Sequence, residues 1–162
     1  MPVRVGQGFD VHPFTDDPQR VLVLGGVTFA GERGLAGHSD SDVIAHAVID
    51  ALLGAAGLGD IGQHFPDTDP AFAGVDSIEL VRRTVAMVQA DGWSPGNVDC
   101  TVVTEEPKLA PRRREMEERL SAAVGAPVTV KGKRAEGLGS LGRAEGIACF
   151  AVALVERDGA GS

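Results

Sequence analysis

The stretch Arg4-Val-Gly-Gln-Gly-Phe-Asp-Val-His12, close to the start of the chain, is typical of a β-strand. Successive side chains of a strand point to opposite faces, so Asp10 and His12 share one face and Val11 takes the other. A second stretch, His38-Ser-Asp-Ser-Asp-Val-Ile-Ala-His46, leads into an apolar run with helical spacing. The two stretches predict a strand and a helix that each carry polar side chains with metal-binding chemistry.

One carboxylate and two imidazoles, those of Asp10, His12 and His46, form a candidate ligand set for a divalent metal ion. Three protein ligands leave a fourth coordination position open, which is typical of catalytic rather than structural zinc sites. A single histidine at a strand end is more often an ordinary hydrogen-bonded residue, and His12 alone would favour that interpretation. The metal site is favoured for the three residues together, because the whole chain has only 4 His.

Length and composition indicate one domain that can bury its own core within 162 residues. The 15 basic and 23 acidic residues give a formal net charge of -8, which argues against non-specific binding to nucleic acid or to a membrane surface. Cys100 and Cys149 lie in apolar runs and are expected to be buried free thiols. No apolar run is long enough to span a bilayer. We therefore expect a cytoplasmic protein with a domain over residues 1–157 and a flexible tail at 158–162.

The order of the expected elements favours an α/β fold of the α+β sandwich type, a mixed β-sheet with helices packed on one side. Strands are expected over residues 3–11, 21–24 and 27–29 (the last two as a hairpin), 98–104, 128–130 and 147–155. Helices are expected over residues 40–53 with a stop at Gly54, from Asp76 to a stop at Gly92, and from Pro111 onward.

The run of residues 112–119 is rich in arginine but does not indicate a nucleic-acid site. On a helix its charges form i, i+4 pairs, which is typical of a solvated face: Arg113 with Glu117, Arg114 with Glu118, and Glu115 with Arg119.

Five motifs are distributed along nearly the whole chain: Gly8-Phe-Asp-Val-His12, His38-Ser-Asp-x-Asp42 with His46, Gly59-Asp-Ile-Gly62 continuing into Phe65-Pro-Asp-Thr-Asp-Pro70, Pro107-Lys108 followed by Pro111, and Gly142-Arg-x-Glu-Gly146. Together they resemble the 2-C-methyl-D-erythritol 2,4-cyclodiphosphate synthase family of the non-mevalonate isoprenoid pathway. The third motif is the longest and the most specific of the five.

The resemblance implies an enzyme that cyclises 4-diphosphocytidyl-2-C-methyl-D-erythritol 2-phosphate and releases CMP. It implies Zn²⁺, or Mn²⁺ or Co²⁺ with the same ligand types, at Asp10, His12 and His46. It also implies a second ion, Mg²⁺ or Mn²⁺, which Glu136 holds against the substrate diphosphate. Catalytic roles fall on His38, Lys108 and Glu136.

The resemblance further implies a substrate-binding set and an assembly. The family assembles as a homotrimer with active sites between subunits, and Arg143 matches a ring at the trimer axis, where an isoprenoid diphosphate could bind. His64 is expected to be a bystander at the loop surface. The implied substrate-binding residues are Asp10, His12, His38, Ser39, Asp60, Gly62, Phe65, Pro66, Asp67, Thr68, Asp69, Pro107, Lys108, Leu109, Glu136 and Arg143.

The chain departs from the family pattern between Lys131 and Glu136, where a run of threonines is usual and Gly132-Lys-Arg-Ala135 stands instead. One hypothesis is that Lys133 or Arg134 pairs with a substrate phosphate in place of a hydroxyl donor. The alternative is that both side chains point to solvent and backbone amides alone bind the phosphate.

Two other functions remain open at the level of sequence. A water on the open metal position could hydrolyse a phosphate, which would make the protein a zinc-dependent phosphohydrolase. The altered segment around Lys133 could also mark a catalytically impaired trimer that binds isoprenoid diphosphates. The intact set of candidate metal ligands argues against that loss.

Overall fold

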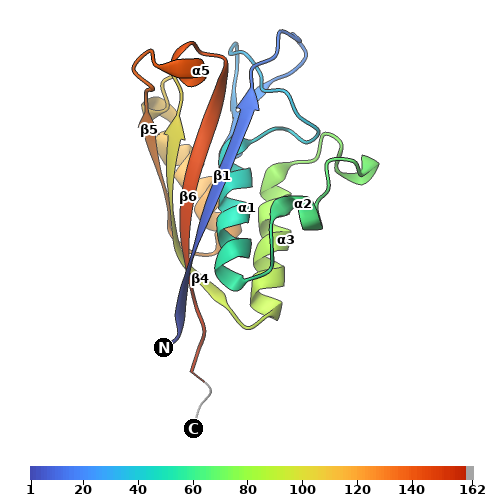
Figure 1. The fold of residues 1–162 in the computed structure, drawn as a ribbon, viewed down its shortest axis with the longest axis vertical. Coiled ribbons are helices and arrows are strands. Elements are labelled where there is room, and N and C mark those ends of the chain that lie inside the picture. Colours follow the sequence, from blue (N-terminus) through green and yellow to red (C-terminus); the bar gives the residue numbers. More distant parts are fainter. Residues whose placement is uncertain (160–162) are drawn as a thin grey trace.

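The structure is a computed structural model that describes residues 1–159. Its main sheet has four strands in the order β1-β6-β4-β5 (Figure 1); β4 and β5 run parallel and the other neighbours are antiparallel. A separate hairpin pairs β2 with β3. The strands are β1 (Val3–Pro13), β2 (Leu22–Leu24), β3 (Val27–Phe29), β4 (Ser94–Val103), β5 (Val128–Lys133) and β6 (Gly146–Glu156).

Three long helices cover one face of this sheet, as Figure 1 shows. The expected fold class, a mixed sheet with helices on one side, is therefore confirmed. The helices are α1 (Val43–Ala56), α3 (Ser77–Ala90) and α4 (Arg113–Val124), with shorter turns at α2 (Ile61–His64), α5 (Gly139–Gly142), η1 (Pro70–Phe72) and η2 (Ala110–Arg112).

Helix α1 lies directly against β1 because two glycines of that strand lack side chains. A Cβ on Gly6 would lie 2.1 Å from the Ala51 carbonyl oxygen, and a Cβ on Gly8 would lie 2.0 Å from that of Ala47. Any other residue at these positions would push the helix away from the strand. The close approach brings the end of β1 to the first turns of α1.

Several predicted boundaries of helices and strands are wrong, and each difference has a physical reason. Helix α1 continues through Gly54 to a left-handed cap at Gly57, because tertiary packing outweighs the low helix propensity of one glycine. Strand β4 begins four residues earlier than expected, at Ser94, where it pairs with Glu156. Helices α2 and α5 span four residues each and are too short for a periodic pattern.

Two of the three ion pairs expected on α4 form, Arg114 with Glu118 and Glu115 with Arg119. The third is wrong: Glu117 instead accepts the Val130 N–H of β5 at 2.9 Å, and no partner for Arg113 is found within residues 1–159. The packing of the helix on the sheet has redirected the carboxylate.

Both cysteines are buried free thiols, as expected. In the described part of the chain, no helix is long and apolar enough to cross a membrane. The expected tail at 158–162 falls mostly outside the described residues, and the extent of the domain stays a prediction.

Candidate active site

The N-terminus of α1 is fixed by Asp42, whose carboxylate is completely buried. It accepts N–H groups from Ala45 of the helix and from Gly25 and Gly26 of the β2–β3 turn, at 2.7 to 3.1 Å. Burial, reinforced by the negative charge of Asp40, raises the pKa of Asp42 to about 6 against the effect of these N–H groups. This cap ties the hairpin to the helix and sets the position of His46, one turn further along.

Asp10, His12 and His46 converge as the sequence predicted. Asp10 Oδ2 lies 2.9 Å from His12 Nε2 and 3.0 Å from His46 Nδ1, and the two ring nitrogens are 3.3 Å apart. Ligands of a tetrahedral zinc ion with bonds of about 2.1 Å lie about 3.4 Å from each other. The three atoms therefore need to open only slightly to hold such an ion.

The other nitrogen of each imidazole has a partner of its own. His12 Nδ1 lies 2.8 Å from the Ala36 carbonyl oxygen, so Nδ1 carries the proton and Nε2 is free to bind a metal. His46 Nε2 contacts the hydroxyls of Ser77 at 2.8 Å and Ser39 at 3.0 Å. These contacts orient both rings before any ion binds.

The charges in the cluster favour an ionised carboxylate. Burial opposes its charge, but hydrogen bonds and the charges of His12 and His46 lower the pKa of Asp10 to about 2. Burial likewise disfavours a charged His12, but the carboxylate of Asp10 and the Ala36 carbonyl raise the pKa of that imidazole above 6.5. Asp10 is thus an anionic ligand at neutral pH.

The loop before α1 is held by Arg20, a residue that the sequence did not single out. Its guanidinium donates to the carbonyl oxygens of Leu35, Gly37 and Ser39, and to the hydroxyl of Ser41, at 2.6 to 2.8 Å. No sequence signal identifies this role, because all four acceptors lie 15 to 21 residues away.

The ligand set opens into a cavity of about 310 Å³. His38 Nε2 lies 2.7 Å from the Asp69 carbonyl oxygen, and Asp60 caps α2, so the long motif forms one wall. Pro66 and Thr68 lie in the same loop, while His64 binds the Leu58 carbonyl and does not line the cavity. The expected site residues that line it are Asp10, His12, His38, Ser39, His46, Gly62, Phe65 and Asp67.

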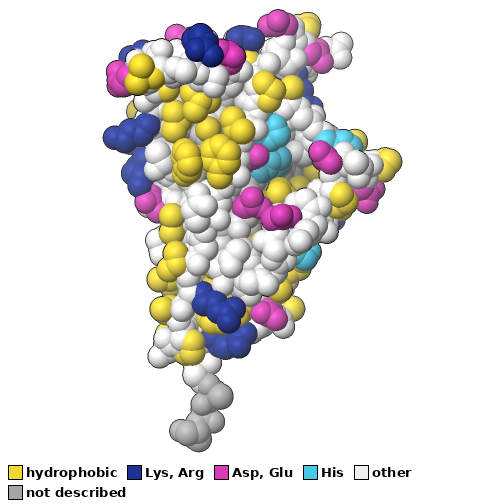
Figure 2. All heavy atoms as spheres, in the orientation of Figure 1, with side chains coloured by type: hydrophobic (Ala, Val, Ile, Leu, Met, Phe, Trp, Pro, Cys, Tyr) yellow, Lys and Arg dark blue, Asp and Glu magenta, His cyan; other side chains and the backbone are white. Residues whose placement is uncertain are grey.

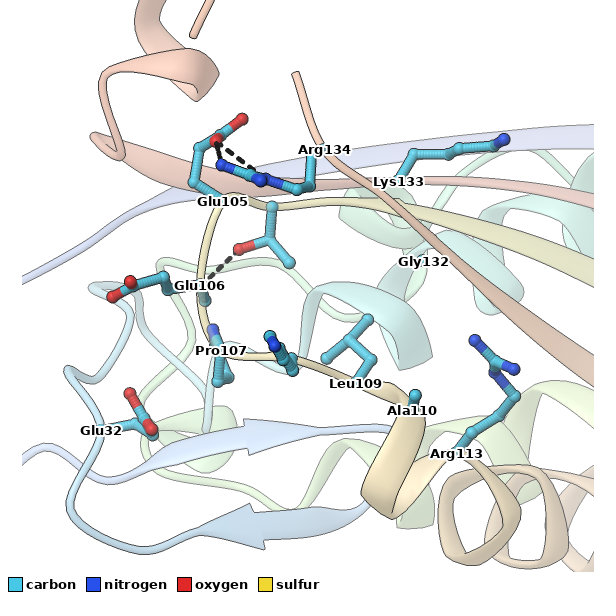
Figure 3. A pocket seen from close by; sticks show the side chains of 12 residues that line it. Glu32, Glu105, Glu106, Pro107, Leu109, Ala110, Arg113, Gly132, Lys133 and Arg134 are labelled. Atoms are coloured by element: carbon cyan, nitrogen blue, oxygen red, sulfur yellow. Dashed lines mark hydrogen bonds and ion pairs between the residues drawn. The ribbon is translucent and has the colours of Figure 1, made fainter. Parts of the chain in front are cut away.

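A second cavity of about 580 Å³ lies beside the ends of β4 and β5 (Figure 3). It contains the expected residues Pro107, Lys108 and Leu109, and also Lys133 and Arg134. The sequence did not single out Glu32 or Arg113 as part of this cavity.

The two cavities lie at opposite edges of the sheet, because β1 and β5 are its outer strands (Figure 1). The structure therefore does not bring Lys108 together with the metal ligands of the same chain. Glu136, exposed just after β5, and Arg143, which pairs with Glu145 at 2.6 Å, line neither cavity. Their expected roles stay predictions.

An α/β fold with an Asp-His-His set on the wall of a cavity is typical of a class of proteins that can hold a divalent metal ion. Comparison with known proteins identifies the family. The sequence profile of the YgbB family matches residues 3–156, and the chain belongs to this family.

Similar proteins extend over nearly all of the chain. The 2-C-methyl-D-erythritol 2,4-cyclodiphosphate synthase of Bordetella petrii is 55% identical over 160 residues, which are 97% of this chain and 98% of the relative. The structure of IspF from Plasmodium falciparum in complex with CDP matches with a TM-score of 0.83 and 32% identity, covering 97% of both chains. The bifunctional IspDF of Campylobacter jejuni matches with a TM-score of 0.91 and 38% identity, over 96% of this chain and 42% of that one.

Proposed function

We propose that this protein is a metal-dependent cyclodiphosphate synthase of isoprenoid precursor synthesis. It converts 4-diphosphocytidyl-2-C-methyl-D-erythritol 2-phosphate to 2-C-methyl-D-erythritol 2,4-cyclodiphosphate and releases CMP. The observation that carries the proposal is the convergence of Asp10, His12 and His46 at a cavity, in a chain 55% identical to a named synthase.

The reaction needs little covalent help from the protein. An oxygen of the 2-phosphate attacks the β-phosphorus, a new P–O bond forms, and the bond from that phosphorus to the oxygen of CMP breaks. Water is not consumed, so the enzyme is a phosphorus–oxygen lyase. The protein must hold the two phosphates in line and neutralise the charge that develops.

A divalent ion bound by Asp10, His12 and His46 would polarise a phosphate oxygen and neutralise part of its charge. Zn²⁺, Mn²⁺ and Co²⁺ all suit one carboxylate and two imidazoles. A second ion, Mg²⁺ or Mn²⁺, is proposed at Glu136, which is exposed and free to meet a substrate diphosphate.

The smaller cavity is proposed to hold the methylerythritol phosphate. The Ser39 hydroxyl lies beside the metal ligands and can donate a hydrogen bond to a phosphate. His38 lines the same cavity, with its Nε2–H donated to the Asp69 carbonyl oxygen. The loop from Asp60 to Asp69 supplies polar groups for the sugar hydroxyls, and Phe65 supplies an apolar surface for the methyl group. The larger cavity, with Pro107, Lys108 and Leu109, is proposed to take the cytidine diphosphate.

We propose a homotrimer with active sites between subunits, since one chain holds the two cavities at opposite sheet edges. The face of the sheet away from the helices is also open and apolar, as Figure 2 shows beside the histidines. A second copy of the chain would cover it. The exposed apolar side chains on this face of the sheet include Val5, Phe9, Val11, Phe150 and Val152.

Two predictions about the protein's surroundings remain. An isoprenoid diphosphate on the trimer axis near Arg143 rests on the family resemblance, and a cytoplasmic location rests on the composition of the chain. Neither is needed for the proposed reaction.

The deciding experiment incubates the protein with the proposed substrate, Zn²⁺ and Mg²⁺ and follows the products by phosphorus NMR. Cyclic diphosphate with CMP supports the synthase. A linear phosphate would indicate a phosphohydrolase instead. No turnover by folded, metal-loaded protein would favour an impaired isoprenoid-diphosphate-binding trimer.

A further inference from the structure

Three cationic side chains of this acidic protein have no hydrogen bond or ion pair within residues 1–159, namely Lys108, Arg113 and Lys133. The chain has 15 Lys and Arg in total, and the others all have such a partner. All three line the same cavity of about 580 Å³. The lining has four basic side chains and three acidic ones, Glu32, Glu105 and Glu106, which gives it a net charge of +1 in a chain whose net charge is -8. A locally positive cavity on an acidic protein favours an anionic ligand.

The local structure explains why Lys133 is available and its neighbour is not. Arg134 donates to Glu105 at 3.0 and 3.3 Å, and the Ala135 N–H reaches the same carboxylate at 2.7 Å. Although desolvation opposes it, these hydrogen bonds lower the pKa of Glu105, so the pair is fully charged at neutral pH. Arg134 is thus a structural residue.

Arg113 is unpaired for a different reason. Its natural partner one turn further along α4, Glu117, is bound to the Val130 N–H of β5. Arg113 is also the first residue of α4, and a cation is disfavoured at the positive end of a helix. In Figure 3, Lys133 lies above Gly132 and Arg113 lies below it, at the start of α4, and all three residues line the cavity.

We propose that Lys133 and Arg113 bind the phosphates of a nucleoside diphosphate in this cavity, together with Lys108. The inference rests on the proposed function and deepens it, because it assigns two further substrate-binding residues. A diphosphate carries two to three negative charges, and charge-assisted hydrogen bonds from three cations can offset them although Glu32 and Glu106 share the lining. The guanidinium of Arg113 can bind one phosphate in bidentate fashion, and the flexible Lys133 can follow the other.

The test measures binding of cytidine 5′-diphosphate by calorimetry to the unmodified protein and to Lys133→Met, Arg113→Met and Arg134→Met. Methionine keeps the apolar stem and removes the charge. We expect the first two changes each to weaken binding about tenfold, the effect of one lost charge-assisted hydrogen bond, and to reduce its salt dependence. Arg134→Met, the matched control, should stay within about twofold.

Two further probes identify the group that is recognised. Pyrophosphate should lose affinity in the same two variants, whereas the affinity for cytidine should be unchanged in all three. Equal affinity for cytidine 5′-diphosphate in the Lys133→Met, Arg113→Met and unmodified proteins would overturn the proposal, as would a larger loss in Arg134→Met. The Zn²⁺-induced rise in Tm shows that each variant is folded and keeps its metal site.

The binding experiment tests the roles of Lys133 and Arg113 independently of the experiment that tests the synthase reaction. If the unmodified protein makes cyclic diphosphate but these variants bind nucleotide normally, the inference fails and the function stands. If nucleotide binding depends on Lys133 and Arg113 but no cyclic product forms, the inference stands and the synthase function fails.

Discussion

At the scale of the residue, the metal site depends on the protonation states of the Asp10 carboxylate and the His12 imidazole. The pKa of His12 is raised above 6.5, so its contribution to the stability of the metal-free protein is present below about pH 6.5 and is lost as the pH rises through the raised pKa. The pKa of Asp10 is lowered to about 2, so its contribution is present above about pH 4 and is lost on acidification toward pH 2.

Metal binding should therefore strengthen as the pH rises, because the ion must displace the proton that His12 holds. We expect the Zn²⁺-induced rise in Tm to be larger at pH 8 than at pH 5.5, as measured by scanning calorimetry. His46→Gln should abolish the rise at both pH values. An equal rise at the two pH values in the unmodified protein would contradict the proposed role of His12.

Arg20 is not a candidate metal ligand, but it stabilises the loop that precedes helix α1 and the metal site. We expect Arg20→Met to lower the free energy of unfolding by about 2–3 kcal/mol, because three backbone carbonyls and a hydroxyl lose a charged donor. Urea denaturation measures the change. Arg114→Met is the control: its pair with Glu118 is exposed, so the cost should stay below about 0.5 kcal/mol.

At the scale of the element, the site depends on how closely α1 packs on β1. Gly8→Ala should place a methyl group against the Ala47 carbonyl and push the helix outward. The expected cost is about 1–3 kcal/mol of stability, together with weaker Zn²⁺ binding, because His46 moves away from Asp10 and His12. Denaturation and metal titration measure the two effects.

Gly54→Ala, a glycine-to-alanine change on helix α1 itself, is the control for Gly8→Ala on strand β1. The nearest atom to a Cβ there is 3.8 Å away, so the change should stabilise the protein by about 0.5–1 kcal/mol and leave Zn²⁺ binding intact. If Gly8→Ala kept full metal affinity, close packing of strand and helix would not be what assembles the ligand set.

At the scale of the whole molecule, the proposed trimer makes a prediction about mixed assemblies. His46→Ala damages the metal half of the site and Lys108→Ala the nucleotide half, so each variant alone should be inactive. In randomly mixed trimers, about a quarter of the sites combine two undamaged halves from different chains. Co-expression and an activity assay should recover about that fraction of the activity; no recovery would contradict a site shared between subunits.

The sequence by itself was enough to predict the fold class and the candidate metal ligands. The period of two placed Asp10 and His12 on one face of a strand, and the helix expected over residues 40–53 carried His46, so the three candidate metal ligands could be named from the sequence. The order of strands and helices likewise predicted the fold class. These inferences held because strand and helix periodicity are set by backbone geometry within a few residues.

Only the tertiary structure decided which charges are free. From sequence, Lys133 and Arg134 were equal candidates, and Arg113 was expected to pair with Glu117. In the structure Glu105, 29 residues away, pairs with Arg134, and the N–H of Val130, 13 residues away, takes Glu117 from Arg113. A charge pairs with whatever the fold brings within about 3 Å, and that distance is set by packing between elements rather than by spacing along the chain.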